Sequence, residues 1–295
     1  MSARIWQTRP QLAEEETMAR IAVTGASGKT RAVVSDLVEH GHDVVPIDLV
    51  ASPDREVRVL RTDLTDYGET IDALHGTEAV VHLANIPADR LRPPVATFTT
   101  NVAMNFNVFH AAARLGLRRV VWASSETTLG LPFEQPPRYL PIDEDHYPLP
   151  TSTYALSKVA SETVAEHVAQ WSGIAFVALR FSNILDADDY TRFPEHFADP
   201  QLRRWNLWSY IDLRDAATAC RLALNPKVEG AASFIIVARD TVMTTPTVEL
   251  VRGVFPDVEV REKPSGFGSL MSGARAEAEL GFLPEHSWRD AVPRS

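Results

Sequence analysis

The sequence predicts an α/β protein with a doubly wound parallel sheet and a small C-terminal lobe over one edge of that sheet. Three observations lead to this prediction. Short apolar runs of strand length alternate with longer segments of helical periodicity. Most of these runs are apolar on both faces, as in a sheet covered by helices on each side. A glycine-serine turn joins the first run to the first helical segment.

The expected elements follow one another regularly along the first 180 residues. The strand at 21–24 leads through the turn at 25–28 into a helix whose apolar residues at 33, 34, 37 and 38 share one face. Further strands are predicted at 43–48, 58–61, 79–84, 119–123 and 174–180, and further helices at 101–115 and 152–171. After Arg180 an acidic, aromatic and proline-containing stretch breaks the pattern, which indicates the lobe.

Composition and charge exclude several functional classes. The net charge is −10 and no stripe of Lys and Arg stands out, so neither nucleic acid nor a membrane surface is an expected partner. No apolar stretch approaches the roughly 20 residues that span a bilayer. The single cysteine, Cys220, permits no intrachain disulfide and fits a cytoplasmic location. The histidines lack the spacing of a metal site, so no metal is expected.

A phosphate-binding turn is predicted at 24–28, which reads Thr-Gly-Ala-Ser-Gly. Gly25 and Gly28 would let the backbone approach a pyrophosphate at the start of the following helix. Asp48, twenty residues beyond Gly28, ends the second strand, where a carboxylate binds an adenosine ribose and favours NAD over NADP. Arg31 stands where a third glycine would normally be. It implies either a loop one residue short or a long cation at a crowded position, and it leaves NADP as an alternative.

A candidate acid/base pair, Tyr154 and Lys158, lies near the start of the helix at 152–171. Residues four apart share one helix face, so an ammonium group would lie close to the phenol and lower its pKa from about 10. The strand at 119–123 runs into Ser124 and Ser125, whose hydroxyl groups would reach the same edge of the sheet and polarise a substrate oxygen. This set predicts proton exchange with a small hydroxyl or carbonyl substrate.

The chain accordingly divides into three expected parts. Residues 1–17 lack the apolar core of a signal peptide and are expected to be a disordered or artefactual extension. Residues 18–180 form the dinucleotide-binding unit, and residues 181–295 supply the remaining sheet elements and a small substrate-binding lobe.

The order of these motifs resembles that of the extended short-chain dehydrogenases/reductases, the epimerase/dehydratase group with a Rossmann-type fold. The likeness rests on TGASG at 24–28, DLTD at 63–66, VVHLAN at 80–85, TNVAMNFNVFHAA at 100–112, VVWASSETTLG at 120–130, YALSK at 154–158, LRFSN at 179–183 and WSYIDLRDAA at 208–217. The resemblance implies that Tyr154 is the acid/base, Lys158 its modulator and Ser125 the donor to the substrate oxygen.

The resemblance also implies which residues surround the two ligands. The expected cofactor contacts are Gly25, Ser27, Gly28, Lys29, Thr30, Asp48, Asp63, Leu64, Leu83, Ala84, Asn85, Asn101, Tyr154, Lys158 and Phe181. The expected substrate contacts are Ser125, Thr127, Asn183 and Arg192. Relatives commonly pair through the helices at 101–115 and 152–171, so a homodimer is expected.

Two features narrow the expected reaction. Dehydratases of this group carry an Asp-Glu pair, whereas Glu126 is followed by Thr127 here, which disfavours dehydration. The segment at 184–192 resembles the uronate and aldose dehydrogenases, in which an arginine at the position of Arg192 grips a carboxylate. The leading hypothesis is an NAD(P)-dependent dehydrogenase of a sugar or sugar acid. The alternatives are a nucleotide-sugar 4-epimerase that retains NAD and a non-catalytic dinucleotide-sensing protein.

Overall fold

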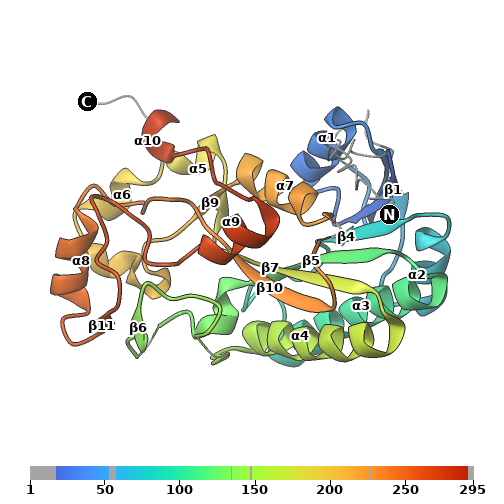
Figure 1. Cartoon of the computed structure of the whole chain (residues 1–295), viewed down its shortest axis with the longest axis horizontal. Coiled ribbons are helices and arrows are strands. Elements are labelled where there is room, and N and C mark those ends of the chain that lie inside the picture. The colour runs from blue at the N-terminus through green and yellow to red at the C-terminus, as the bar shows by residue number, and fades with distance from the viewer. Residues whose placement is uncertain (1–17, 53–57, 134, 147, 226, 292–295) are drawn as a thin grey trace, which may run out of the picture.

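A parallel sheet of seven strands forms the centre of the computed structural model, which describes residues 18–291 apart from 53–57, 134, 147 and 226 (Figure 1). The strands lie in the order β10-β7-β5-β4-β1-β2-β3. Their bounds are β1 Arg20–Thr24, β2 Asp43–Asp48, β3 Leu60–Arg61, β4 Ala79–His82, β5 Arg119–Ser125, β7 Ala175–Phe181 and β10 Ala231–Ile236. The predicted doubly wound sheet is thereby confirmed. The expected extension at 1–17 lies outside the described residues.

The strand order reverses at β1, which pairs with β2 on one side and with β4 on the other. The helix that follows β1 packs on one face of the sheet, whereas the helix that follows β4 packs on the opposite face. Ligands of open α/β sheets bind at the carboxyl ends of two such strands. The fold therefore predicts a ligand-binding site at the carboxyl ends of β1 and β4.

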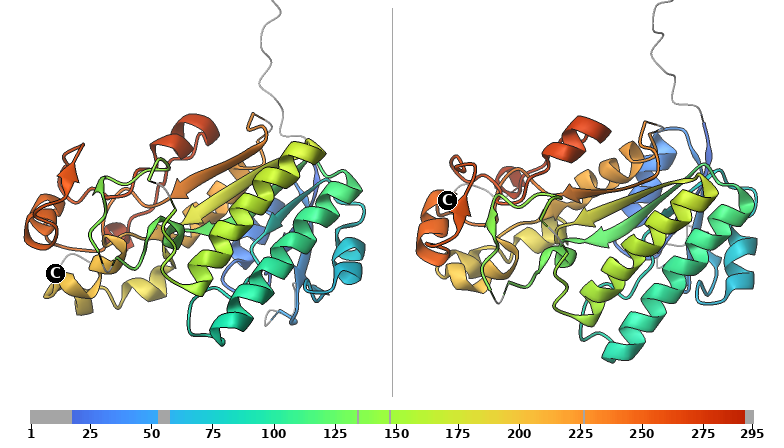
Figure 2. Two further views of the ribbon diagram at one scale, coloured as in Figure 1. Left: turned by 90° about the horizontal axis from the view of Figure 1, so that it is seen from below. Right: turned by 60° about the horizontal axis from the view of Figure 1, so that its bottom comes forward.

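Helices cover both faces of the sheet (Figures 1 and 2). One face carries α1 (Arg31–Glu39), α7 (Leu213–Leu222) and α9 (Ala274–Leu280), and the other carries α2 (Tyr67–Leu74), α3 (Pro94–Leu115) and α4 (Thr153–Ser172). Under α3, the ring of Phe109 packs edge-on against Trp122 and Phe176, with centroids 5.2 Å apart in both pairs. Such pairs add about 0.5–1.5 kcal/mol each beyond simple burial, so this face forms a rigid support for α3 and α4.

A second hydrophobic core forms the lobe beyond the carboxyl edge of the sheet, around the buried rings of Trp208, Tyr210 and Trp288. Its elements are η1 Glu126–Leu129, β6 Tyr139–Leu140, β8 Ile184–Leu185, α5 Ala187–Tyr190, α6 Pro194–Phe197, η2 Pro200–Leu202, η3 Arg204–Asn206, β9 Ile211–Asp212, α8 Thr247–Val254, β11 Glu259–Val260 and α10 Trp288–Ala291. β6 pairs with β11 and β8 pairs with β9. The chain crosses between sheet and lobe several times, because β6 precedes residue 181 whereas α7 and β10 return to the sheet after it.

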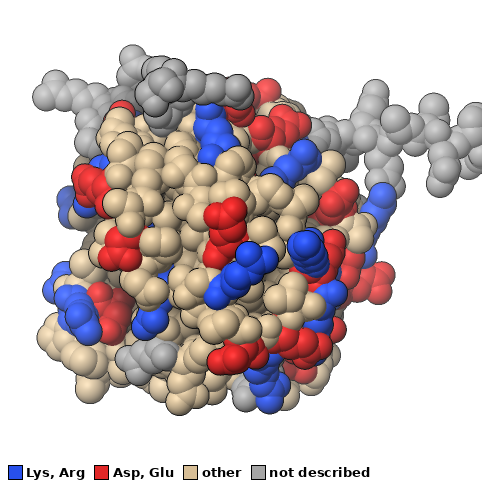
Figure 3. All heavy atoms as spheres, turned by 90° about the vertical axis from the view of Figure 1, so that its left-hand side faces the viewer, with Lys and Arg blue, Asp and Glu red and all other residues tan. Residues whose placement is uncertain are grey.

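The end of the molecule that the lobe occupies carries charges of both signs, interspersed among neutral residues (Figure 3). Within the described part of the chain, none of the helices is both long and apolar enough to cross a membrane. Nor do the described residues contain a cluster of His, Cys, Asp or Glu suited to hold a metal ion.

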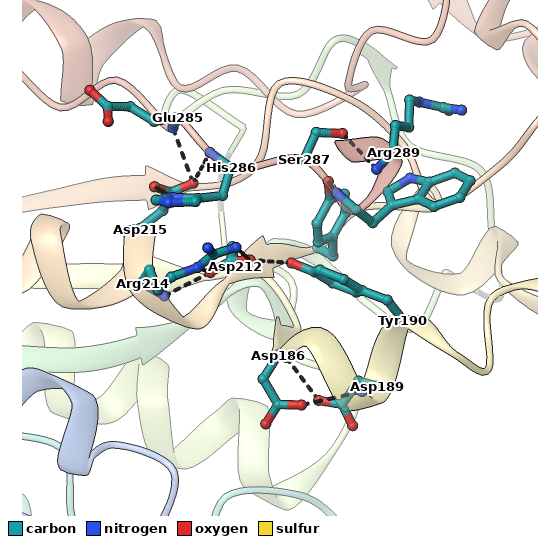
Figure 4. Close-up of polar contacts among 12 residues, drawn as sticks. Asp186, Asp189, Tyr190, Asp212, Arg214, Asp215, Glu285, His286, Ser287 and Arg289 are labelled. Carbon is teal, nitrogen blue, oxygen red and sulfur yellow. Dashed lines mark hydrogen bonds and ion pairs between the residues drawn. The ribbon is translucent and has the colours of Figure 1, made fainter. Parts of the chain in front are cut away.

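A buried hydrogen bond joins the first lobe helix to the start of α7. Tyr190 of α5 is fully buried, and its hydroxyl donates to the carboxylate of Asp212, which caps α7 (Figure 4). Arg214 donates to the same carboxylate from Nε at 2.9 Å and Nη2 at 2.8 Å. Although burial opposes it, these bonds from Arg214 and Tyr190 hold the pKa of Asp212 below its usual range.

We expect Tyr190→Phe to lower the free energy of unfolding by about 1–2 kcal/mol, because it removes a donor from a buried carboxylate. Tyr67→Phe is the matched control, since its hydroxyl meets His110 Nδ1 at 3.0 Å in a partly buried position. Urea unfolding of both variants makes the comparison. If the free energy of unfolding fell equally in the two variants, the Tyr190–Asp212 bond would stabilise the fold no more than the partly buried Tyr67 contact does.

Candidate active site

The turn after β1 packs directly on the loop after β4. Gly25 has φ +77°, and a Cβ atom there would lie only 2.8 Å from the backbone nitrogen of Ala84. Only glycine combines this left-handed conformation with so close an approach. The backbone nitrogen of Ser27 donates to Asp48 Oδ2 at 2.9 Å, and the Thr30 hydroxyl donates to the Gly25 carbonyl oxygen. The predicted glycine turn and the acid that ends β2 therefore lie in contact.

Arg31 does not lie at a crowded position, so that part of the prediction is wrong. The residue begins α1 and its side chain is exposed. It lines a cleft of about 740 Å³ between α1 and the start of α7, together with Ser35, Thr218 and His286. The arginine is tolerated because α1 begins at this residue and its side chain leaves the helix outward rather than toward the sheet.

Lys29, an expected cofactor contact, connects the glycine turn to the lobe. Its Nζ lies 2.9 Å from Asp186 Oδ2 and also contacts Asp189 Oδ2. Both carboxylates belong to the start of α5, where Asp186 caps the helix and Asp189 completes the capping box. The Lys29 ammonium group thus forms ion pairs with two lobe carboxylates next to the glycine turn.

The loop after β4 is held by hydrogen bonds from two sides. The Thr24 hydroxyl meets His82 Nδ1 at 2.6 Å and accepts from the backbone nitrogens of Leu83 at 3.1 Å and Ala84 at 3.2 Å. Asn101 of α3 accepts from the Ile86 nitrogen at 2.8 Å and donates to the Ile86 oxygen at 3.1 Å. The backbone of this loop is thereby fixed between β1 and α3.

One amide oxygen in this loop, Asn85 Oδ1, is buried and has no hydrogen-bond partner among the described residues. A buried acceptor of this kind is costly unless a ligand or water satisfies it. It lies one residue beyond the close contact between Gly25 and Ala84. These two features fit a dinucleotide, whose ribose hydroxyl groups can donate to such an oxygen and whose pyrophosphate needs a close backbone approach.

The expected adenine contacts lie farther along the same edge. The Asp63 carboxylate accepts from the backbone nitrogen of Thr65 at 2.9 Å, and the Leu64 side chain is buried. Two further expected contacts lie at the end of β7. Phe181, the last residue of β7 and an expected cofactor contact, is buried in the core that packs against α1 and α7. Asn183 follows β7, and its carbonyl oxygen accepts from the Ile211 nitrogen at 3.0 Å.

Ser125, Tyr154 and Lys158 come together where β5 ends beside the first turns of α4. The Ser125 hydroxyl is hydrogen-bonded to the Tyr154 phenol and accepts from Thr127 Oγ1 at 2.9 Å. Lys158 is 1% exposed, and its Nζ lies 5.6 Å from the centre of the Tyr154 ring. Lys158 Nζ also donates to the Ala123 carbonyl oxygen at 2.7 Å, which anchors the amine under the sheet edge.

The electrostatics of this set differ from the sequence prediction. Burial raises the pKa of Tyr154 to about 12, the Ser125 hydrogen bond opposes that rise, and the charge of Glu126 adds to it. Burial lowers the pKa of Lys158 to about 7, with Glu162 opposing. The sequence predicts a lowered pKa for Tyr154, whereas the net shift of that pKa is upward, because removal from water disfavours the phenolate.

Arg192, expected at the substrate, is not brought to this set. Its side chain is 73% exposed and its Nε lies 3.9 Å from Glu195. The charge of Arg203 acts instead on the buried carboxyl group of Glu126, the residue that directly follows Ser125. The Nε atom of Arg203 is buried without a partner among the described residues. Sequence patterns could not reveal Arg203, because it stands in a lobe segment without a recognisable motif.

Comparisons with known proteins agree with this geometry. Residues 21–236 match the model of the NAD dependent epimerase/dehydratase family. A UDP-glucose 4-epimerase from Corynebacterium glutamicum is 27% identical over 308 aligned positions, which cover 91% of this chain and 92% of the relative. A uronate dehydrogenase from Pseudomonas putida is 29% identical over 203 positions, which cover 66% of this chain and 68% of the relative.

A solved structure shows the same fold. It is a crystal structure of a short-chain dehydrogenase/reductase superfamily protein from Agrobacterium tumefaciens with bound NAD. The two structures align with a TM-score of 0.72 at 24% sequence identity, over 92% of this chain and 94% of the other. The architecture around the glycine turn is therefore of the Rossmann type.

We expect Gly25→Ala to lower the free energy of unfolding by more than about 2 kcal/mol, because it combines a left-handed backbone with a clash against Ala84. Gly28→Ala is the control, since a Cβ atom there meets nothing within 4 Å. Urea unfolding monitored by tryptophan fluorescence measures both. A stable Gly25→Ala variant would show that the turn can move away from the β4 loop.

Proposed function

The chain belongs to the NAD dependent epimerase/dehydratase family, and on that premise we propose that it is an NAD-dependent oxidoreductase acting on a hydroxyl group of a sugar or sugar acid. The convergence of Ser125, Tyr154 and Lys158 at the carboxyl end of β5, two strands along the sheet from the glycine turn, carries this proposal. It supplies a hydrogen-bond donor, a proton carrier and an amine at one edge of the sheet.

The geometry of the three side chains supports a separate role for each. NAD, when bound, accepts the hydride from the substrate carbon. Ser125 holds the substrate oxygen by a hydrogen bond, and Tyr154 takes the hydroxyl proton, or returns one when a carbonyl is reduced. Because the pKa of Tyr154 is raised to about 12, the phenol is protonated at neutral pH and is ready to donate. Oxidation, which needs the phenolate, should therefore become faster as pH rises toward that value.

We infer that Arg203 binds the acidic group of the substrate in place of Arg192. Its guanidinium group is partly buried, and its Nη2 donates to the Ser209 carbonyl oxygen at 3.2 Å. Nearby His196 also has a buried ring nitrogen, Nδ1, without a partner among the described residues, and the positive charge of Arg203 acts on it. An unsatisfied donor on a partly buried guanidinium group suits a carboxylate.

A nucleotide-sugar 4-epimerase with retained NAD is the second candidate. It is favoured by the epimerase from Corynebacterium glutamicum, whose similarity covers 91% of this chain. The same three residues would serve both reactions, because epimerisation requires oxidation followed by reduction of the same oxygen. The two activities differ in whether reduced cofactor accumulates.

Incubation of the purified protein with NAD and panels of aldoses, uronates and UDP-sugars should separate the two candidates. We expect NADH to accumulate with an aldose or uronate, as followed by absorbance. We also expect Tyr154→Phe to lower kcat by about 10²–10⁴-fold, because it removes the proton carrier. Tyr67→Phe serves as the control far from the site. An altered UDP-sugar without NADH would instead establish the epimerase.

For an acidic substrate, we expect Arg203→Gln to raise KM by about tenfold or more, the loss of roughly one charge-assisted hydrogen bond. The KM of a neutral aldose should change much less. Arg192→Gln is the matched control and should leave both values nearly unchanged, because its side chain is exposed. If Arg192→Gln raised the KM of the acidic substrate and Arg203→Gln did not, Arg192 would be the substrate-binding residue, as the sequence predicts.

A further inference from the structure

A cleft of about 980 Å³ lies at the amino edge of the sheet, at the opposite end of the strands from Ser125. Its lining includes the first residues of β4, β5 and β7, which are Ala79, Arg119 and Ala175, and several residues of the connection from α7 to β10. We call it the amino-edge cleft. Its volume is typical of sites that bind small molecules, which measure about 300–1,000 Å³.

Arg119 brings a buried guanidinium group to this cleft. The residue is 6% exposed, and its Nη2 donates to the carbonyl oxygen of Val228 at 2.8 Å. Because Val228 also lines the cleft, the guanidinium group reaches from β5 to the opposite wall. The other terminal nitrogen, Nη1, is buried and has no hydrogen-bond partner among the described residues.

No carboxylate in the described part of the chain forms an ion pair with Arg119. The two other arginines of the lining are paired, Arg118 with Glu78 and Arg221 with Asp36. Burial lowers the pKa of Arg119, but a guanidinium group stays charged in proteins. A buried charge without an opposite charge is strongly unfavourable, so Arg119 lacks the anion that its surroundings require.

A second buried nitrogen without a partner lines the same cleft. It is Nδ1 of His42, which lies just before β2 and finds no hydrogen-bond partner within the described ranges. This nitrogen can donate when it carries the ring proton. Glu229, the one acid among the described lining residues, is exposed. The buried polar atoms of the cleft are thus suited to an acceptor from outside the chain.

Apolar side chains form much of the remaining lining. Ile21 of β1 and Val228 are buried, whereas Leu222 and Leu224 are partly exposed. Binding of an apolar group there would remove the leucine side chains from water, which favours association. The amino-edge cleft therefore combines an unpaired guanidinium group with an apolar wall.

We propose that the amino-edge cleft binds an organic anion with an apolar body, whose carboxylate or phosphate oxygens accept hydrogen bonds from Arg119. The planar guanidinium group suits either head group, because two of its N–H groups can bind two oxygens of one anion. The cofactor and the substrate of the proposed function bind at the other edge of the sheet. This site is therefore separate from them and does not depend on the reaction.

Isothermal titration calorimetry of the full chain with octanoate and with octyl phosphate tests the proposal. Saturating NAD is present throughout, so that the probes do not enter the cofactor site. We expect at least one of the two anions to bind, and the stronger of them identifies the preferred head group. Octanamide has the same apolar chain without the charge, and it should bind at least about tenfold more weakly.

Two arginine variants locate the bound anion. Arg119→Gln should weaken the binding of the anion by about tenfold or more, because it removes the charged donor. Arg118→Gln is the matched control, since it removes the same charge from the adjacent residue of the same cleft. The Arg118 side chain is 68% exposed and paired with Glu78, so this variant should change the affinity by less than about threefold.

Two further measurements separate binding from a structural role of Arg119. The anion should raise the melting temperature of the wild-type protein but not that of Arg119→Gln, because only a folded protein with the site is stabilised by the ligand. Arg119→Lys keeps the charge without the planar group and should bind the anion with intermediate affinity. If Arg119→Gln does not fold, a several-fold weaker affinity of Arg119→Lys carries the same expectation.

Three results would overturn the proposal. The first is that the folded wild-type protein binds neither anion, and the second is that octanamide binds as tightly as octanoate. The third is an unchanged affinity in the Arg119 variants, or an equal loss in Arg118→Gln and Arg119→Gln, which would indicate a general attraction of anions to the surface.

Discussion

The contact between the turn after β1 and the loop after β4 is the constraint on which the site depends. The sheet reverses its strand order there, and the backbones of the two connections approach each other closely at Gly25 and Ala84. The Thr24 hydroxyl then fixes the loop through its two nitrogens. A side chain at Gly25 would push apart the very segments that a dinucleotide has to bridge.

Exclusion of water gives the neighbouring residues their chemical character. Tyr154, Lys158 and Glu126 are all buried. Burial shifts the pKa of each side chain in the direction that favours its neutral form. Such a site disfavours every isolated charge, so the ionisation of one group changes the others.

Much of the fold and part of the site could be predicted from the sequence, because strand periodicity, the glycine turn and the spacing of Tyr154 and Lys158 are local patterns. Prediction failed where the outcome depends on three-dimensional surroundings. The direction of the Tyr154 pKa shift depends on how much water is excluded, which spacing does not reveal. The exposure of Arg192 and the burial of part of Arg203, on which the proposed choice between them rests, depend on how the lobe segments fold.

Lys29 gives the molecule a mechanical property as well. The lysine and Asp189 are 160 positions apart in the chain, yet their ion pair ties the glycine turn to the first helix of the lobe. Any outward swing of that helix has to separate these partners first. Because the lysine side chain is 50% exposed, dissolved ions weaken the attraction. The strength of this link between the glycine turn and the lobe is consequently set in part by the salt content of the surrounding medium.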